Sequence, residues 1–151
     1  MAIKRIGIVG CGTVGQGLLK ANEIGALTLK ISGITSRSKE KAQKFLSTLK
    51  KSPKFYTREE LIAKSDLIVE AASGDIVPEL ACETFESGKD LMVISIGALI
   101  DSPEIIELAK KQGCKLYAPS GAIAGLDGIK SASIGRLDKV TMITRKPLIS
   151  L

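Results

Sequence analysis

The feature that most constrains this chain is a glycine-rich segment that directly follows a short apolar run near the N-terminus. Residues 6–9 read Ile-Gly-Ile-Val and lead into Gly10-Cys11-Gly12-Thr13-Val14-Gly15, which has the spacing Gly-x-Gly-x-x-Gly. This order predicts a strand, a tight turn and a helix N-terminus, where free backbone N–H groups can bind the diphosphate of a dinucleotide. Gly10 would make the turn, Gly12 would let the diphosphate approach and Gly15 would let the helix pack on the strand. The alternative is a purely structural glycine turn. The predicted cofactor contacts here are Gly10, Cys11, Gly12, Thr13 and Val14.

Downstream, apolar strand patterns alternate with amphipathic helix patterns. This alternation predicts an α/β fold: a Rossmann-type, doubly wound parallel sheet with right-handed crossovers over residues 1–119. The helix signals include a capping box at 57–60, glycines that end helices at 88 and 113, and a Ser102 N-cap followed by Pro103. The expected strands, about six in all, are 4–9, 27–35, 55–56, 66–71, 91–96 and 115–118. The expected helices are 13–22, 39–49, a short one after 57, 75–87 and 103–113.

The pattern changes after Pro119. Small residues fill 120–128, a helical pattern covers 129–134, and 137–144 suggests one more strand. We expect residues 120–151 to be the start of a second, α+β domain for substrate binding or dimerisation. A lone strand is not independently stable, so either another subunit completes it, giving a homo-oligomer such as a dimer, or the chain is a piece of a larger protein. Val140, Met142, Leu148 and Ile149 would then make this end prone to self-association.

Composition narrows the classes of partner. The chain has 151 residues and a net charge of +6, yet its lysines cluster on what looks like the solvated face of the 39–49 helix rather than among aromatic residues, so we expect no nucleic-acid partner. We expect no membrane partner because no apolar run reaches the roughly 18–20 residues that span a bilayer. With no leader pattern before the first strand, a cytoplasmic location is expected. The three cysteines have neither disulfide nor zinc spacing, and no metal site is predicted.

The end of the second expected strand bears on the choice of cofactor. Dinucleotide folds place an acid there to bind the ribose hydroxyls of NAD, or an arginine to accept the 2′-phosphate of NADP. This chain has Thr35-Ser36-Arg37-Ser38, with no carboxylate. Arg37 can pair with a phosphate, and Ser36 and Ser38 can donate hydrogen bonds to it. NADP is therefore the predicted cofactor, with NAD as the alternative if Arg37 is only a solvated charge.

Three further loops follow expected strands and consist of small residues. They are 71–74, 95–98 and 118–122, and they would meet at the carboxyl edge of the sheet, where ligands bind. Small residues there would let a nicotinamide ribose approach the backbone, although each loop taken alone could be an ordinary connection. The chain has no histidine, and we assign no catalytic residue. The predicted cofactor contacts are Ala71, Ala72, Ser73, Ser95, Gly97 and Ala98.

Four segments together resemble the L-aspartate dehydrogenase family: Gly10–Gly15, Ser95–Leu99, Pro119–Ile123 and Thr144–Pro147. The first is generic, whereas the other three, in this order and spacing, are more specific. The resemblance covers essentially the whole chain but only about the first half of the family's usual length. It implies hydride transfer between aspartate and a nicotinamide cofactor, giving iminosuccinate and a link to NAD biosynthesis, and it assigns a cofactor contact to Ala122. The family's catalytic histidine lies beyond the last of these segments and has no counterpart here.

Two other functions stay open at this point. One is another two-domain NADP-dependent reductase of the homoserine-dehydrogenase or sugar-oxidoreductase kind. The other is a non-catalytic module that senses nucleotides and binds a partner protein. Activity of the 151-residue chain by itself is not expected.

Overall fold

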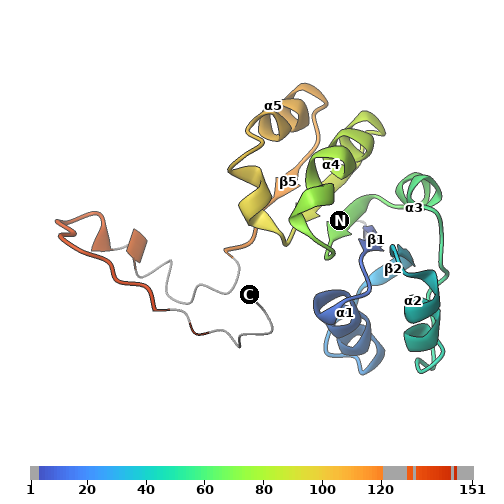
Figure 1. Ribbon diagram of the computed structural model, residues 1–151. Coiled ribbons are helices and arrows are strands. Elements are labelled where there is room, and N and C mark those ends of the chain that lie inside the picture. Colours follow the sequence, from blue (N-terminus) through green and yellow to red (C-terminus); the bar gives the residue numbers. More distant parts are fainter. Residues whose placement is uncertain (1–3, 121–128, 131, 144, 146–151) are drawn as a thin grey trace. The chain divides into compact units, whose positions relative to one another are not determined.

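A parallel β-sheet organises the first part of the chain in the computed structural model (Figure 1), which describes residues 4–120, 129–130, 132–143 and 145. Its five strands lie in the order β2-β1-β3-β4-β5, and each neighbouring pair runs parallel. Sequence order therefore reverses direction at the boundary between β1 and β3. The bounds are β1 Arg5–Val9, β2 Lys30–Thr35, β3 Leu67–Glu70, β4 Asp90–Val93 and β5 Leu116–Tyr117.

The expected strand at 55–56 is reduced to an isolated parallel bridge between Phe55 and Ile34 of β2. Two hydrogen bonds hold it: the Ile34 N–H donates to the Lys54 carbonyl, and the Tyr56 N–H donates to the Ile34 carbonyl, both at 2.9 Å. With this bridge counted as a position, the order is that of the dinucleotide-binding sheet, 3-2-1-4-5-6. The predicted Rossmann-type fold is confirmed, with five strands and one bridge in place of six strands.

Helices cover both faces of the sheet. On one face, α1 (Thr13–Glu23) and α2 (Lys39–Leu46) contribute Leu19 and Leu46 to a cluster with Ile8 and Ile34. On the other face, a larger cluster includes Phe85, the bulkiest of the fully buried side chains among the described residues. Its helices are α3 (Arg58–Lys64), α4 (Val77–Glu86) and α5 (Glu104–Lys111), and α4 and α5 run side by side in Figure 1. Alternate strand residues thus serve opposite faces, as a doubly wound sheet requires.

The helix ends test the local signals directly. The Thr57 capping box is present, and Gly88 and Gly113 have φ values of +67° and +64° just after α4 and α5, so these predictions are confirmed. The Ser102 cap is wrong: Pro103 is the N-cap of α5, and no side chain caps that helix. Ser102 is instead buried, and its carbonyl accepts the Ile105 N–H at 3.2 Å. Two short 3₁₀ helices, η1 (Gly74–Ile76) and η2 (Ile96–Leu99), replace the expected start of the fourth helix and the end of the fifth strand.

The chain divides into two units, Met1–Pro119 and Ser120–Leu151. In the second unit, residues 129–130 and 132 are helical. The strand expected from residue 137 onward is wrong for residues 137–143, which are exposed and form no strand, while Thr144 lies outside the described residues. Backbone groups there have no neighbouring strand to pair with in the described part of the chain, and a single strand does not hold its conformation alone. Val140 and Met142 are exposed, whereas Leu148 and Ile149 lie outside the described residues.

None of the helices in the described residues combines the length and the apolar character that crossing a bilayer would require.

Candidate functional site

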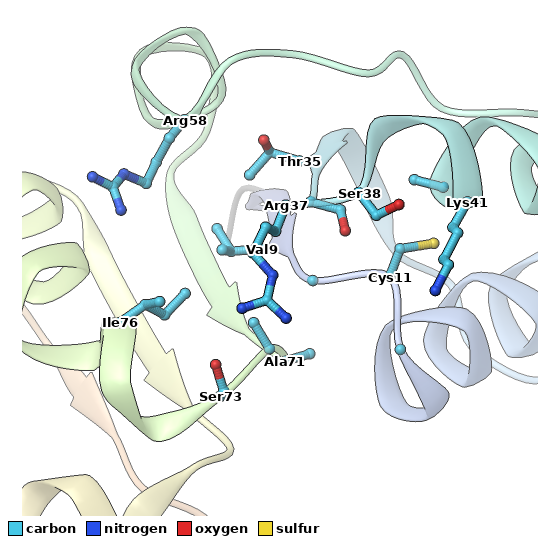
Figure 2. Close-up of a pocket in the computed structure, with 15 residues that line it drawn as sticks. Val9, Cys11, Thr35, Arg37, Ser38, Lys41, Arg58, Ala71, Ser73 and Ile76 are labelled. Atoms are coloured by element: carbon cyan, nitrogen blue, oxygen red, sulfur yellow. The ribbon is translucent and has the colours of Figure 1, made fainter.

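A cleft of about 630 Å³ opens at the carboxyl ends of β1, β2 and β3 (Figure 2). This edge is the point where the strand order reverses, which is where open α/β sheets bind their ligands. Three loops form its walls: the glycine-rich turn after β1, the segment after β2 and the segment after β3. Of the residues predicted from the sequence, those that line it are Gly10, Cys11, Gly12, Ser36, Arg37, Ser38, Ala71, Ala72 and Ser73.

The glycines of the β1 turn differ in what a side chain would meet. At Gly10, with φ +113°, an added Cβ would lie 2.3 Å from the Ala71 carbonyl oxygen. At Gly15 it would lie 2.2 Å from the Gly10 carbonyl oxygen, whereas at Gly12 nothing lies within 4 Å. The outer two glycines therefore permit close backbone contacts inside the fold. Gly12 alone leaves free space, on the side where the N-terminus of α1 has no side-chain cap.

Thr13 and Val14 form the first turn of α1, next to the cleft rather than in its lining. Cys11 is half-buried, and burial raises the pKa of its thiol, with a hydrogen bond from Gln16 acting in the opposite direction. A thiol with a raised pKa is a poor nucleophile, which agrees with a spacer role for Cys11 in the turn. The Gln16 side-chain amide also donates to the Cys11 carbonyl at 3.0 Å and holds the turn against the helix.

Three cations line the cleft: Arg37 after β2, Lys41 in α2 and Arg58 in α3. In Figure 2 the Arg37 guanidinium extends into the cleft, and Lys41 approaches it from the side of Cys11. The lining contains no aspartate or glutamate among the described residues. Such an arrangement attracts anionic ligands. Sequence reasoning missed Lys41 because its helix face was assigned to solvent; the side chain is exposed and also lines the cleft.

Arg58 is held in place by α4. Its Nη2 lies 2.8 Å from Glu79 Oε1 and 2.6 Å from Glu83 Oε1. The hydrogen bond from Arg58 lowers the pKa of the Glu79 carboxyl. Arg58 therefore has less charge to offer a ligand than Arg37 or Lys41. From the sequence, Arg58 was predicted only as the first residue of a helix, and no sequence pattern indicated that it would line the cleft.

Asp75 lies in η1, just before α4, and is not among the residues that line the cleft. A hydrogen bond from Ser73 lowers the pKa of its carboxyl, as does, more weakly, the positive charge of Arg37. The exposed Asp75 carboxyl is thus close enough to Arg37 to feel its charge.

A second group that sequence reasoning missed is Glu70, the last residue of β3, which is 0% exposed. Its Oε1 accepts the Ala72 N–H at 2.7 Å and the Ser95 hydroxyl at 3.1 Å, and its Oε2 accepts the Ser95 N–H at 2.9 Å. The carboxylate therefore joins the loop after β3 to the loop after β4. A glutamate inside an apolar strand was the available signal, because buried acids occur only where they are paired or hydrogen-bonded.

Three more of the predicted contacts are not in the cleft lining, and a fourth lies outside the described residues. Ser95, Gly97 and Ala98 follow β4 and are not in its lining; they adjoin the β3 loop, where a Cβ on Gly74 would lie 3.4 Å from the Ala98 Cβ. Ala122 lies outside the described residues. Within the described residues, no group of three or more Cys, Asp or Glu side chains is placed to hold a metal ion.

A parallel sheet whose strand order reverses beside a glycine-rich turn, with a cleft at that point, defines a dinucleotide-binding domain of the dehydrogenase type. Residues 10–119 match the family described as homoserine dehydrogenase, NAD binding domain, and the chain belongs to this family. Its cofactor is accordingly a nicotinamide dinucleotide.

Curated relatives narrow the similarity further. The chain is 41% identical over 147 residues to an L-aspartate dehydrogenase from Methanocella arvoryzae, covering 95% of this chain and 54% of the relative. It is 38% identical over 155 residues to an L-aspartate dehydrogenase from Methanothermobacter thermautotrophicus, covering 100% of this chain and 60% of the relative. The chain thus spans little more than half the length of these relatives. The resemblance found in the four sequence segments is confirmed, over the N-terminal part of that family.

Solved structures support the same fold. A homoserine dehydrogenase from Thiobacillus denitrificans superposes with a TM-score of 0.71 at 21% identity, covering 87% of this chain and 32% of that one. A UDP-N-acetylglucosamine 3-dehydrogenase from Acidithiobacillus ferrooxidans gives a TM-score of 0.67 at 16% identity, covering 89% and 45%. At these identities the likeness establishes the shared sheet and helices and does not distinguish among substrates.

Proposed function

We propose that this chain is the cofactor-binding part of an L-aspartate dehydrogenase and that its cofactor is NADP in preference to NAD. The observation that carries the cofactor choice is that Arg37, Lys41 and Arg58 all line the cleft, without a carboxylate in the lining of its described part. An acid at the end of β2 would repel a 2′-phosphate, and Arg37 stands there instead.

The residues of the cleft fit the parts of such a cofactor. Free N–H groups at the start of α1 and the open space at Gly12 suit the diphosphate. Arg37 and Lys41, with the hydroxyls of Ser36 and Ser38, suit the 2′-phosphate. Ala71, Ala72 and Ser73 continue the cleft toward β4, which suits the nicotinamide ribose. The bound cofactor would supply a hydride acceptor for the α-carbon of aspartate.

Several parts of this proposal concern the longer protein that the relatives represent. They are oxidation of aspartate to iminosuccinate for NAD biosynthesis, a cytoplasmic location, and a homo-oligomer such as a dimer. We also propose that residues 1–119 form the cofactor domain and that residues 120–151 begin the substrate domain. Support comes from the relatives' length, of which this chain covers little more than half, and from the division of the chain after Pro119.

Calorimetric titration of the chain with NADP⁺ and NAD⁺ tests the cofactor choice. A charge-assisted phosphate contact predicts that NADP⁺ binds roughly tenfold or more tightly than NAD⁺. Arg37→Ala and Lys41→Ala should weaken NADP⁺ binding and leave NAD⁺ binding nearly unchanged. Lys44→Ala is the matched control, because Lys44 lies in the same helix and outside the cleft lining. Tighter binding of NAD⁺ by the wild-type chain would contradict the choice of NADP.

The substrate is tested on a version of the protein extended to the length of its relatives. Aspartate should support reduction of NADP⁺, and homoserine and sugar acids should not. Turnover of homoserine in place of aspartate would favour the alternative function, a reductase of the homoserine-dehydrogenase kind. Tight cofactor binding with no turnover of any amino acid, together with a stable complex with another protein, would instead favour a sensing module.

A further inference from the structure

The carboxylate of Glu70 stands out among the charged groups because it is fully buried and bonded to the N–H of Ala72, a residue that lines the cleft. Glu70 is 0% exposed, and the ion pairs of the described residues do not include it. Its hydrogen-bond partners are two backbone N–H groups and one hydroxyl, so both oxygens act as acceptors. A negative charge is therefore held inside the protein without a neighbouring cation to neutralise it in the part of the chain that the structure describes.

The boundary between β1 and β3, where the strand order reverses, is the switch point of the sheet. The groups that Glu70 binds belong to the half of the sheet that contains β3 and β4. Ala72 follows β3 and lines the cleft, and Ser95 follows β4. A dinucleotide that straddles a switch point puts its adenosine half over one set of strand ends and its other half over the opposite set. Because Arg37 and Lys41 stand on the β2 side, the loops tied by Glu70 lie on the side left for the nicotinamide.

We propose that Glu70 is a positioning residue for the nicotinamide half of the cofactor, and that its buried charge favours the oxidised cofactor over the reduced one. The inference rests on the proposed function. The oxidised nicotinamide ring carries a positive charge that the reduced ring lacks, so a nearby uncompensated carboxylate attracts the first form selectively. Attraction of this kind is far stronger in a protein interior than in water.

The positioning role follows from the contacts of the β3 loop. The Ala71 carbonyl is the group against which Gly10 packs, and the next residue, Ala72, is fixed by Glu70 Oε1. On the other side, Gly74 packs beside Ala98 and Ser95. The carboxylate thus sets the spacing between the turn after β1 and the loops after β3 and β4. Loss of its oxygens would leave the Ala72 and Ser95 N–H groups unpaired within the described contacts.

The experiment compares the dissociation constants of NADP⁺ and NADPH for the wild-type chain and for four variants, with circular dichroism to verify folding. Glu70→Gln and Glu70→Met are neutral residues of similar size, Glu70→Asp keeps the charge, and Ser95→Ala removes one hydrogen bond without changing the charge. For both neutral variants we expect the ratio of the NADP⁺ constant to the NADPH constant to rise roughly tenfold, as a single charge acting through a medium of intermediate dielectric would cause. Glu70→Asp and Ser95→Ala should weaken both forms by similar factors, leaving the ratio unchanged.

Equal weakening of the two redox forms in the neutral variants would overturn the inference, because a merely structural role predicts it. An unchanged ratio with unchanged affinities would overturn it as well. Failure of both neutral variants to fold would place the role of the carboxylate in folding rather than in the cleft, and would also count against it. If the wild-type chain binds neither form, it is the proposed function that fails. That result is distinct from wild-type binding with no shift of the ratio.

Discussion

Gly10 and Ala71 approach so closely that a Cβ on residue 10 would lie 2.3 Å from the Ala71 carbonyl oxygen and 2.5 Å from its carbonyl carbon. This contact joins the turn after β1 to the end of β3, the two strands on either side of the switch point. The Ala71 N–H also donates to the Val9 carbonyl at 2.8 Å, so the two strand ends are hydrogen-bonded up to the base of the cleft. The shape of the cofactor site therefore depends on the absence of a single side chain.

Gly10→Ala should destabilise the fold as well as abolish cofactor binding. The methyl group would collide with backbone atoms that cannot move away, at a φ of +113° that side-chain-bearing residues rarely adopt. We expect a loss of about 2–5 kcal/mol in the free energy of unfolding, combining backbone strain with overpacking. Urea denaturation followed by circular dichroism measures it. Wild-type stability in this variant would mean that the turn can adopt another conformation.

Gly12→Ala should weaken cofactor binding too, but it should leave the stability of the fold at the wild-type level. Its φ of −86° suits alanine, and nothing in the protein lies within 4 Å of the added methyl. The methyl would instead occupy space that a diphosphate needs next to the backbone, so the dissociation constant of NADP⁺ should rise roughly tenfold or more. Calorimetry on this variant and on Gly17→Ala, an equally open glycine further along α1, separates the two positions. Equal affinities for both variants would contradict this placement of the diphosphate.

The sequence predicted the structure best where only one type of residue can satisfy a local backbone conformation or contact. Gly10 and Gly15 are needed for backbone contacts shorter than a Cβ permits, and Gly88 is needed for a positive φ, so each is legible from the residue type alone. The Thr57 box is readable for the same reason, because both of its side chains bond to backbone groups three residues away. Strand ends were less accurate, since pairing with neighbouring strands decides where a strand stops; β2 begins at Lys30 rather than at residue 27.

The parts of the site that escaped prediction depend on contacts between distant segments. Lys41 and Arg58 both line the cleft but come from separate helices, and their sequence surroundings fit ordinary solvent-facing positions. Glu70 finds its partner Ser95 25 residues further along the chain. The Ser102 cap failed because Pro103 takes the N-cap position and Ser102 is buried. Such outcomes are decided by tertiary packing, which no local pattern encodes.

Thr57→Ala should lower the stability of the protein by about 1 kcal/mol, the usual cost of losing an N-cap side chain. Thr57 Oγ1 accepts the Glu60 N–H at 3.2 Å, and Glu60 Oε2 accepts the Thr57 N–H at 3.1 Å. The α3 helix that this box begins buries Leu61 and carries Arg58 at the cleft. Urea denaturation measures the change, with Thr57→Ser as the control that keeps the hydroxyl. An alanine variant as stable as the serine variant would show that packing of Leu61 alone holds the helix.

Asp66 makes a contribution to the stability of the protein that depends on pH. Its Oδ2 accepts the Arg5 N–H at 2.8 Å and Arg5 Nε at 3.1 Å, and its Oδ1 accepts Nη2 at 2.7 Å. These bonds hold the pKa of the Asp66 carboxyl far below its usual value, and the hydrogen bond from the Arg5 side chain makes the largest contribution. A carboxyl whose pKa is lower in the folded state contributes stability that is fully present above its unfolded pKa, about 3.9 for an ordinary aspartate, and is lost as the pH falls toward the folded pKa.

Asp66→Asn should therefore lower the free energy of unfolding by a constant amount between about pH 5 and pH 8, and the deficit relative to wild type should shrink below about pH 4. The amide keeps one acceptor oxygen but loses the charge that pairs with Arg5. Both side chains are more than one-third exposed, so added salt should reduce the deficit as well. Urea titrations at a series of pH values measure it, with Asp101→Asn as the control, since Asp101 belongs to no ion pair within the described residues. A deficit that stays the same from pH 7 down to pH 3 would mean that the amide disturbs the packing beside β1 and that the charge of Asp66 contributes nothing.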